Sequence, residues 1–449
     1  MKYFGILVIF LACCSDSGDI PYGESPGDAD GGQQIDEAGD PGGDDAGVGG
    51  DDAGQQTDEA QPVERCQKLP APSGNIISVT PTGNLPQIVL DANSGDVIVL
   101  ADGNYNLGGE QLNFRVDGVT LRSESGNPES VTIDGEYQTG EILAISANDI
   151  TIAEVTLTRA YYHPIHVTGR SDSGISGTWI YRVRVIDPAE QAIKINSSGA
   201  GYYTDYGKIE CCHIELTDAG RPHIRNNCYT GGVDAHEAWG WEIRDNLIKG
   251  FWCDTGLSEH GIHMWQCCRD TLVERNTIID CARGIGFGMG DSGTERDYPD
   301  DPYPGVGYIG HYDGIIRNNL IFATIDGFDS GILLEQARGS KVVHNTVVSL
   351  QPPFNCIEWR WDNTLVEIKN NLVSHNLMPR GGTADLAGNV ENAPTSVFEN
   401  HNAGELHLVS GATGCIDQGV SLPGGLCDED IDGDPRDANP DVGADEYVE

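Results

Sequence analysis

The chain has 449 residues, with 70 Asp and Glu against 26 Lys and Arg, and a formal net charge of −44 at pH 7. This acidity excludes non-specific binding to nucleic acid, because the protein repels the phosphate backbone. Apart from a short N-terminal run, no segment is apolar enough to approach the ~20 residues that a membrane-spanning helix needs.

Residues 1–14 combine the basic Lys2 with an apolar run and end in Leu-Ala-Cys-Cys. A basic start followed by a short apolar run is typical of a secretory signal peptide. The ending is similar to a bacterial lipoprotein cleavage box, which implies a lipid on Cys13 or Cys14. The alternative is an ordinary signal peptide that contains Cys. We therefore expect an exported protein that is held at the cell surface through lipid alone, or is otherwise secreted.

Residues 15–65 are rich in Gly, Asp, Gln and Ala, and hold fifteen acidic residues and one basic residue. With almost no large apolar side chain, this segment cannot offset the entropy lost on ordering, and we predict a disordered acidic tether. The chain from Cys66 onward is also acidic. It will repel polyanionic glycans unless a local basic patch or a bridging cation such as calcium is present.

A short pattern recurs eight times between residues 150 and 373, with branched aliphatic residues three positions before and two positions after each anchor. The anchors are Val155, Val183, Cys212, Asn246, Asn276, Asn319, Asn345 and Asn371. A fixed period that tolerates insertions indicates a solenoid. The five consecutive Asn anchors predict a structural ladder in which stacked side chains hydrogen-bond from turn to turn and tolerate left-handed φ. The pattern does not extend to the chain before residue 150.

A second strand follows in most units, and its two outer residues are apolar while the middle one usually is not. The triplets begin at Ile165, Ile193, Val233, Ile262, Ile285, Ile332 and Ile357. This period of two puts one face inward and the other into solvent. Short β-branched strands punctuated by Gly, Asn and Asp favour coils of strand over helix pairs. We predict an all-β chain, with a parallel β-helix of about ten coils over residues 66–410 and a closing segment over 411–449.

Several segments resemble a known superfamily. Residues 95–105, 118–128 and 131–135 resemble the first coils of secreted right-handed parallel β-helix proteins, the superfamily that includes the pectate lyases. Residues 415–419, 430–436 and 442–447 resemble the closing segment of bacterial surface β-helix proteins. The resemblance covers roughly residues 75–449 and implies a right-handed parallel β-helix. It does not fix the activity, because the superfamily holds lyases, hydrolases, epimerases and adhesins. No family catalytic residue is carried over.

Eleven Cys lie from Cys66 onward, and in an exported chain they are disulfide candidates. Cys415 and Cys427 are the best pair, because they close a short loop before the C-terminal segment. The odd number leaves at least one thiol free or paired elsewhere.

The middle residues of the second strands form an outward row, and the residues two positions later form another. The first row is His166, Lys194, Asp234, His263, Gly286, Leu333 and Glu358, and the second is Thr168, Asn196, His236, Trp265, Gly288, Glu335 and Arg360. Because coils stack about 4.8 Å apart, we expect Lys194, Asp234 and His263 to be neighbours. The insertions at 197–206, 217–232, 250–260 and 289–313 would wall a groove over this strip and bring Glu259 and His260 to it.

Three chemistries compete at this site. A polysaccharide lyase or epimerase would use Lys194 or His263 as the base, with Asp234 tuning it or holding calcium. A glycoside hydrolase is less consistent, because Asp234 and Glu335 would lie about 14 Å apart, where catalytic pairs need roughly 5 or 6.5–9.5 Å. Glu237 or Glu259 would then have to join Asp234.

The third chemistry is a divalent-metal site. Asp234, His236 and His263, with His260 as a further ligand, would suit zinc or another transition metal. Residues 430–434 are a separate calcium candidate, for which a simple turn is the favoured interpretation.

We therefore predict a cell-surface protein that binds a polysaccharide in a groove over one parallel sheet and cleaves or modifies it. Lys194, Asp234, His236 and His263 are the candidate catalytic residues. The candidate substrate-binding residues are His166, Asn196, Trp265, Glu259, His260, Glu335 and Arg360. The alternative is a non-catalytic carbohydrate-binding or adhesive surface protein, which needs only an open aromatic groove.

Overall fold

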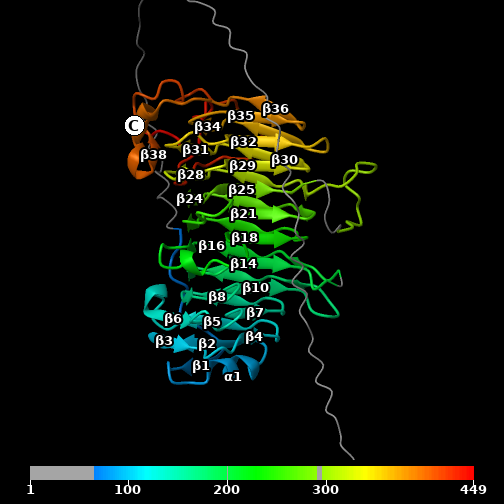
Figure 1. The fold of residues 1–449 in the computed structure, drawn as a ribbon, viewed down its shortest axis with the longest axis vertical. Helices are drawn as coiled ribbons and strands as arrows, with labels where there is room; N and C mark the ends of the chain where they lie inside the picture. The colour runs from blue at the N-terminus through cyan, green and yellow to red at the C-terminus, as the bar shows by residue number, and fades with distance from the viewer. Residues whose placement is uncertain (1–64, 200, 291–295, 449) are drawn as a thin grey trace, which may run out of the picture. The chain divides into compact units, whose positions relative to one another are not determined.

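The computed structural model describes residues 65–199, 201–290 and 296–448. Three long parallel sheets stack coil upon coil through the part of the chain that is described (Figure 1). Each coil contributes one strand to sheet A, then one to sheet B and then one to sheet C. The predicted parallel β-helix is therefore confirmed, and the ten strands in each of sheets B and C agree with about ten coils.

Sheet A begins with β1 (Asn75–Val79), β2 (Asp96–Leu100), β5 (Thr120–Ser123), β8 (Thr151–Ala153), β12 (Trp179–Tyr181), β16 (Lys208–Glu210), β19 (Glu242–Arg244), β23 (Leu272–Glu274), β27 (Ile315–Arg317) and β30 (Ala337–Val343). It continues through β33 (Leu365–Lys369) and β36 (Thr383–Ala387), and β30 also pairs with β26 (His311–Tyr312), which pairs with β22 (Cys268–Arg269). A short pair is formed by β11 (Ile175–Ser176) and β15 (Thr204–Asp205).

Sheet B contains β3 (Gly103–Asn106), β6 (Val131–Asp134), β9 (Thr156–Thr158), β13 (Arg184–Ile186), β17 (His213–Glu215), β20 (Leu247–Lys249), β24 (Thr277–Ile279), β28 (Leu320–Ala323), β31 (Thr346–Ser349) and β34 (Leu372–Val373). Sheet C contains β4 (Leu112–Phe114), β7 (Leu143–Ile145), β10 (Ile165–Thr168), β14 (Gln191–Asn196), β18 (Gly231–His236), β21 (His260–Trp265), β25 (Arg283–Phe287), β29 (Ser330–Glu335), β32 (Asn355–Arg360) and β35 (Leu377–Arg380). The coils before residue 150, which the anchor pattern does not reach, are thus part of the same column.

The Asn anchors form the predicted ladder in the turn between sheets A and B. Asn276 Nδ2 donates to Asn319 Oδ1 at 3.0 Å, and Asn319 Nδ2 donates to Asn345 Oδ1 at 2.9 Å. The ladder runs one step further than the sequence indicates, because Asn371 Nδ2 donates to Asn389 Oδ1. The left-handed φ belongs to the residue before each anchor, not to the anchor, as at Asn318 with φ 52°. The anchor side chain is thereby turned inward, where its polar atoms meet the next coil.

The column interior is filled by one or more inward residues from nearly every strand of the three sheets. These are branched aliphatic side chains with no exposed surface, such as Ile209, Ile243 and Val273 from sheet A. Helix α1 (Leu85–Leu90), which the sequence analysis did not predict, lies at the N-terminal end of the column, and its Leu85 and Val89 are buried in the same core (Figure 1). It covers apolar surface that the first coil would otherwise expose.

The C-terminal segment packs on the outer face of sheet B. The hairpin of β37 (Phe398–Asn400) and β38 (Glu405–Leu408) forms a second core with residues of β28, β31 and β34, and Val442 and Ala444 complete it. Four short 3₁₀ helices lie in the described loops: η1 (Pro128–Ser130), η2 (Arg221–His223), η3 (Thr395–Val397) and η4 (His401–Ala403). Among the described residues, none of the helices has the length and apolar character to span a bilayer. The expected signal peptide and almost all of the expected tether lie outside the described residues.

The predicted Cys415–Cys427 disulfide is wrong. Both thiols are free and buried, Cys415 in the second core and Cys427 against Asn318 Oδ1 at 3.2 Å. The observed disulfides are Cys66–Cys211 and Cys228–Cys253. Closeness in sequence misleads here, because the solenoid brings residues 145 positions apart into contact.

A Gly284→Ala substitution should lower the free energy of unfolding by about 1–3 kcal/mol. A Cβ at Gly284 would collide with the backbone carbonyl of Gly331 on the next coil, and stacked backbones cannot move apart without breaking the sheet ladder. Urea denaturation would measure the change. Gly327→Ala is the matched control, because a Cβ there meets no atom within 4 Å. Equal stability of the two variants would contradict the argument.

Candidate functional site

The outward row on sheet C has the register that the sequence predicts. His166 pairs with Lys194, Lys194 with Asp234, and Asp234 with His263. The row continues through Gly286 and Leu333 to Glu358. His236 and Trp265 of the second row are also paired neighbours. Seven coils thus bring residues that are far apart in sequence into one strip.

A bend at the start of each strand adds a third outward row. In β14, Ala192 and Ile193 are consecutive residues and both lie in the core, so Gln191 and Lys194 both fall on the outer face. The same bend in β21 turns Gly261 and Ile262 inward and leaves His260 beside His263. The outer members of this row are Gln191, Gly231, His260, Arg283, Ser330 and Asn355. The sequence analysis missed this row, although a small residue before each inward Ile or Val, such as Gly232, Gly261, Gly284 and Gly331, signals it.

Lys194 and Asp234 form the centre of the strip. The Lys194 ammonium donates to Asp234 Oδ2, and it also contacts His236 Nε2 at 2.8 Å. The other oxygen, Asp234 Oδ1, accepts a hydrogen bond from the Trp265 indole at 2.7 Å. Lys194 and Asp234 are buried, whereas His236 and Trp265 are partly exposed above them. The strip therefore combines a buried ion pair with two aromatic rings that are partly exposed above it.

Burial and their mutual attraction together determine the protonation states of Lys194 and Asp234. Burial alone would lower the pKa of Lys194, but the Asp234 carboxylate raises it above its usual value. Burial alone would raise the pKa of Asp234, but the Lys194 ammonium and His236 hold it well below its usual range. Burial and the Lys194 ammonium lower the pKa of His236. At neutral pH the strip thus holds an ammonium, a carboxylate and a neutral imidazole in contact.

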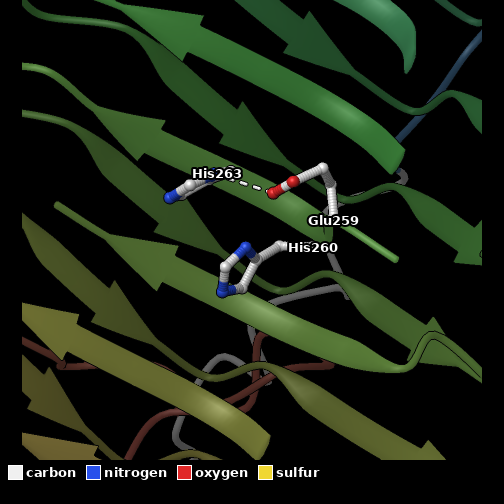
Figure 2. Close-up of side chains that lie close together, drawn as sticks. All are labelled: Glu259, His260 and His263. Carbon is white, nitrogen blue, oxygen red and sulfur yellow. Dashed lines mark ion pairs between the residues drawn. The ribbon is translucent and has the colours of Figure 1, made fainter. Parts of the chain in front are cut away.

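One coil further along, Glu259, His260 and His263 converge, as Figure 2 shows. Glu259 immediately precedes β21, and its Oε2 lies 3.6 Å from Nδ1 of His263. His263 Nε2 donates to the carbonyl of Gly288 at 3.1 Å. The two imidazole rings are 4.2 Å apart between centroids. Burial lowers the pKa of His263 to about 4, and burial also holds the pKa of His260 well below its usual value.

This convergence differs from the metal set that the sequence predicts. His236 faces Lys194 and the Oδ2 atom of Asp234, not the Glu259–His263 cluster. The Trp265 ring packs against both His236 and His263, at 4.3 and 5.3 Å between centroids. The structure therefore groups His263 with Glu259 and His260. The set of Asp234, His236 and His263 stays a prediction.

The insertions flank the strip from both ends of its strands. Segments 217–232 and 250–260 precede β18 and β21 and are joined by the disulfide Cys228–Cys253. Segments 197–206 and 289–313 follow β14 and β25, and Arg296 joins them through a bidentate pair with Asp205 at 2.7 and 2.8 Å. A cavity of about 690 Å³ lies within the first pair of loops, lined by Arg221 and Trp252 and by no residue of the strip. A groove over Lys194 itself stays a prediction.

The remaining candidate binding residues lie on either side. His166 bridges Glu141 Oε1 at 2.5 Å and Asn196 Oδ1 at 2.6 Å. Arg360 forms an ion pair with Glu335 at 3.2 Å. Glu335 lies three coils from Asp234. Glu335 also accepts the backbone N–H of Gly290 at 2.6 Å. These groups extend the polar strip, but Glu335 does not approach Asp234 as a hydrolytic pair would.

The C-terminal calcium candidate has the structure of a turn. Asp430 Oδ1 accepts the backbone N–H groups of Asp432, Gly433 and Asp434 at 2.8–2.9 Å. Its Oδ2 accepts the N–H of Glu446 at 2.9 Å. This carboxylate is occupied by the backbone, which favours the structural interpretation.

Comparisons with known proteins identify the fold. No family model matches the chain, and no curated protein sequence matches it. Among solved structures, pectate lyase Pel9A is 14% identical and has a TM-score of 0.56, with 84% of this chain and 97% of that chain covered. The Agl-KA catalytic domain is 9% identical, with 72% and 66% covered and a TM-score of 0.48. The surface adhesin PfbA of Streptococcus pneumoniae is 12% identical, with 68% and 84% covered and a TM-score of 0.44. By its stacked parallel sheets and its likeness to Pel9A, this chain is a right-handed parallel β-helix protein of the pectate lyase-like fold.

Proposed function

We propose that the chain binds a uronate-containing polysaccharide across sheet C and acts on it as a lyase or epimerase. One observation carries this proposal. The Lys194 ammonium lies in contact with the neutral imidazole of His236, at 2.8 Å between Nζ and Nε2. Removing a proton from the carbon next to a carboxylate needs a cation that neutralises the carboxylate and a neutral base that takes the proton. The Lys194 ammonium and the His236 imidazole match these two roles.

The protonation states favour His236 over Lys194 as the base. Lys194 is protonated at neutral pH because Asp234 raises its pKa. His263 is 2% exposed and its Nδ1 faces carboxylates, which leaves a substrate little access to it. His236 is the most exposed of the four candidate catalytic residues. We therefore assign it the base role and leave Lys194 as the cation.

The chemistry then proceeds in balanced steps. The substrate carboxylate attracts Lys194, and His236 Nε2 takes the proton from the carbon α to that carboxylate. The electron pair of the broken C–H bond moves into an enolate that the Lys194 ammonium stabilises. In a lyase the β C–O bond then breaks, a C=C bond forms, and the leaving oxygen takes a proton from solvent. In an epimerase a proton returns to the same carbon from the opposite face.

Assays on a panel of uronate polysaccharides test this proposal. The full chain should generate the ultraviolet absorbance of an unsaturated uronate, or exchange the α-proton for deuterium if it is an epimerase. His236→Ala should lower kcat by about 10²–10⁴-fold, the usual contribution of a general base. His213→Ala, on the outer face of sheet B, is the matched control and should keep full activity. Full activity of His236→Ala would place the base elsewhere.

One observation favours a non-catalytic alternative. Asp234 accepts hydrogen bonds from both Lys194 and Trp265, so the strip presents fixed polar and aromatic groups, which suffice to bind a glycan without chemistry. The neighbour PfbA is described as a surface adhesin and Pel9A as a pectate lyase. A polysaccharide that binds wild type, loses affinity with Trp265→Ala and yields neither product nor exchange would support the alternative and reject the lyase.

We further propose that the chain is exported and displayed at the cell surface by a lipid on Cys13 or Cys14. The apolar run before these residues and the acidic segment after them support this proposal. Metabolic labelling with a fatty acid, lost in the double variant Cys13→Ala/Cys14→Ala, would test it. Equal labelling of that variant would reject it.

A further inference from the structure

Glu259, His260 and His263 place three ligand atoms close together on the outer face of β21. One carboxylate oxygen and one ring nitrogen from each His all lie within 4.8 Å of one another (Figure 2). The bend at Gly261 and Ile262 makes this possible, because it puts His260 and His263 on one face although they are three residues apart in a strand. The cluster follows from the backbone of the coil, not from mobile side chains.

The ring nitrogens in this cluster lack partners. Within the described residues, Nδ1 and Nε2 of His260 and Nδ1 of His263 are buried and have no hydrogen bond. Both residues are only 2% exposed. Leaving a buried polar atom unsatisfied costs about 1–3 kcal/mol. An ion bound between Glu259 and the two rings would satisfy one nitrogen of each His.

The surroundings of each ring keep it in place. His263 Nε2 donates to the carbonyl of Gly288, which fixes the tautomer and leaves the Nδ1 lone pair facing Glu259. The His260 ring lies directly over Gly286 of the next coil, where a Cβ would come within 2.7 Å of Nε2.

We propose that Glu259, His260 and His263 bind a transition-metal ion of the zinc class. Two imidazoles and one carboxylate suit zinc and its neighbours, whereas calcium takes oxygen ligands alone. Three protein ligands leave a fourth position open for water or for an anionic group of a substrate. The inference goes beyond the proposed function. Metal binding is tested independently of any activity on a polysaccharide.

A second cluster provides an internal comparison. His407, Asp432 and Asp445 also bring ligand atoms within 4.8 Å of one another. There His407 Nε2 is already paired with Asp432 Oδ2 at 2.9 Å, and Asp445 Oδ2 accepts the N–H of Leu408 at 2.6 Å. These groups satisfy each other without an ion, so we expect no tight metal binding at this cluster.

The experiment titrates the full chain, stripped with a chelator, with Zn²⁺ in a calorimeter and with Co²⁺ by visible absorption. We expect one tight Zn²⁺ site per chain and the absorption of Co²⁺ in a low-coordination nitrogen and oxygen environment. His260→Ala and Glu259→Gln should each weaken Zn²⁺ binding by about 100-fold or more, since even the loss of a group that only orients a metal ligand costs 10–100-fold. His407→Ala is the matched control and should bind Zn²⁺ like wild type.

Melting temperatures separate a lost site from a lost fold. Glu259→Gln keeps the size of its side chain, so the metal-free Glu259→Gln variant should melt close to metal-free wild type. His260→Ala removes a buried ring and should melt lower, and Zn²⁺ should raise the melting temperature of wild type but of neither variant. Gly286→Ala, which displaces the His260 ring and keeps all three ligands, should also weaken Zn²⁺ binding. Absence of tight Zn²⁺ binding by wild type, or unchanged binding by His260→Ala, would overturn the inference, and so would its loss in His407→Ala.

Discussion

Replacing Asp234 with Ala should lower the free energy of unfolding by about 3–5 kcal/mol, the usual cost of removing one partner from a buried ion pair. The Lys194 ammonium would remain buried at 8% exposure with no counter-charge, and the Trp265 indole N–H would lose its acceptor. Removing Asp234 should also abolish activity on the proposed substrate, because the position of Lys194 depends on it. Urea denaturation followed by tryptophan fluorescence would measure the loss of stability.

A double-mutant cycle makes this prediction specific. In Asp234→Ala/Lys194→Met the isolated charge is gone, so part of the lost stability should return. The interaction free energy from the four proteins should then amount to about 1–3 kcal/mol. Asp234→Asn, which keeps an oxygen for Trp265, should fall between wild type and Asp234→Ala. Strictly additive losses would show that Lys194 and Asp234 do not depend on each other.

The sequence predicts the strip well because the β-helix converts sequence period into spatial contact. Once the triplets at Ile193, Val233 and Ile262 are aligned, the pairing of Lys194, Asp234 and His263 follows from strand register alone. The Asn ladder follows in the same way, since one residue type recurs at one position of the coil. These features depend on the period and not on the details of side-chain packing.

Features that break the period could not be predicted in this way. The bend that puts His260 beside His263 depends on two consecutive inward residues, and a strict alternation of faces hides it. The sequence therefore predicts a metal set of Asp234, His236 and His263 with His260 as a further ligand, and it places Glu259 among the substrate-binding residues. The disulfide Cys66–Cys211 joins a segment before the first coil to the middle of the column, and no local spacing encodes that contact. Loop conformations such as the Arg296–Asp205 link likewise depend on long-range packing.

The Asn ladder gives the second large expected effect. Replacing Asn319 with Ala should lower the free energy of unfolding by about 3 kcal/mol or more, at about 1–3 kcal/mol for each buried group left without a partner. Asn319 Nδ2 donates to the carbonyl of Val273 and to Asn345 Oδ1, and its Oδ1 accepts the N–H and the side-chain amide of Asn276. All these groups are buried, and Ala reaches none of them. Denaturation would measure the loss, with Asn113→Ala on the partly exposed face of sheet C as the control.

The strands that lose protection first distinguish a broken ladder from a simple loss of packing at Asn319. In a solenoid each coil is held by its neighbours, so the lost bonds should loosen the coils on either side of Asn319 before the rest of the column. Hydrogen exchange should therefore speed up first in β24, β28 and β31, while strands near the N-terminal end keep their protection. Asn319→Asp separates the two halves of the interaction, because Asp still accepts from Asn276 but cannot donate to Asn345. If Asn319→Asp were as stable as wild type, the hydrogen bonds that Asn319 donates would contribute nothing to stability. Uniform hydrogen exchange along the column would contradict the prediction that the ladder stabilises neighbouring coils locally.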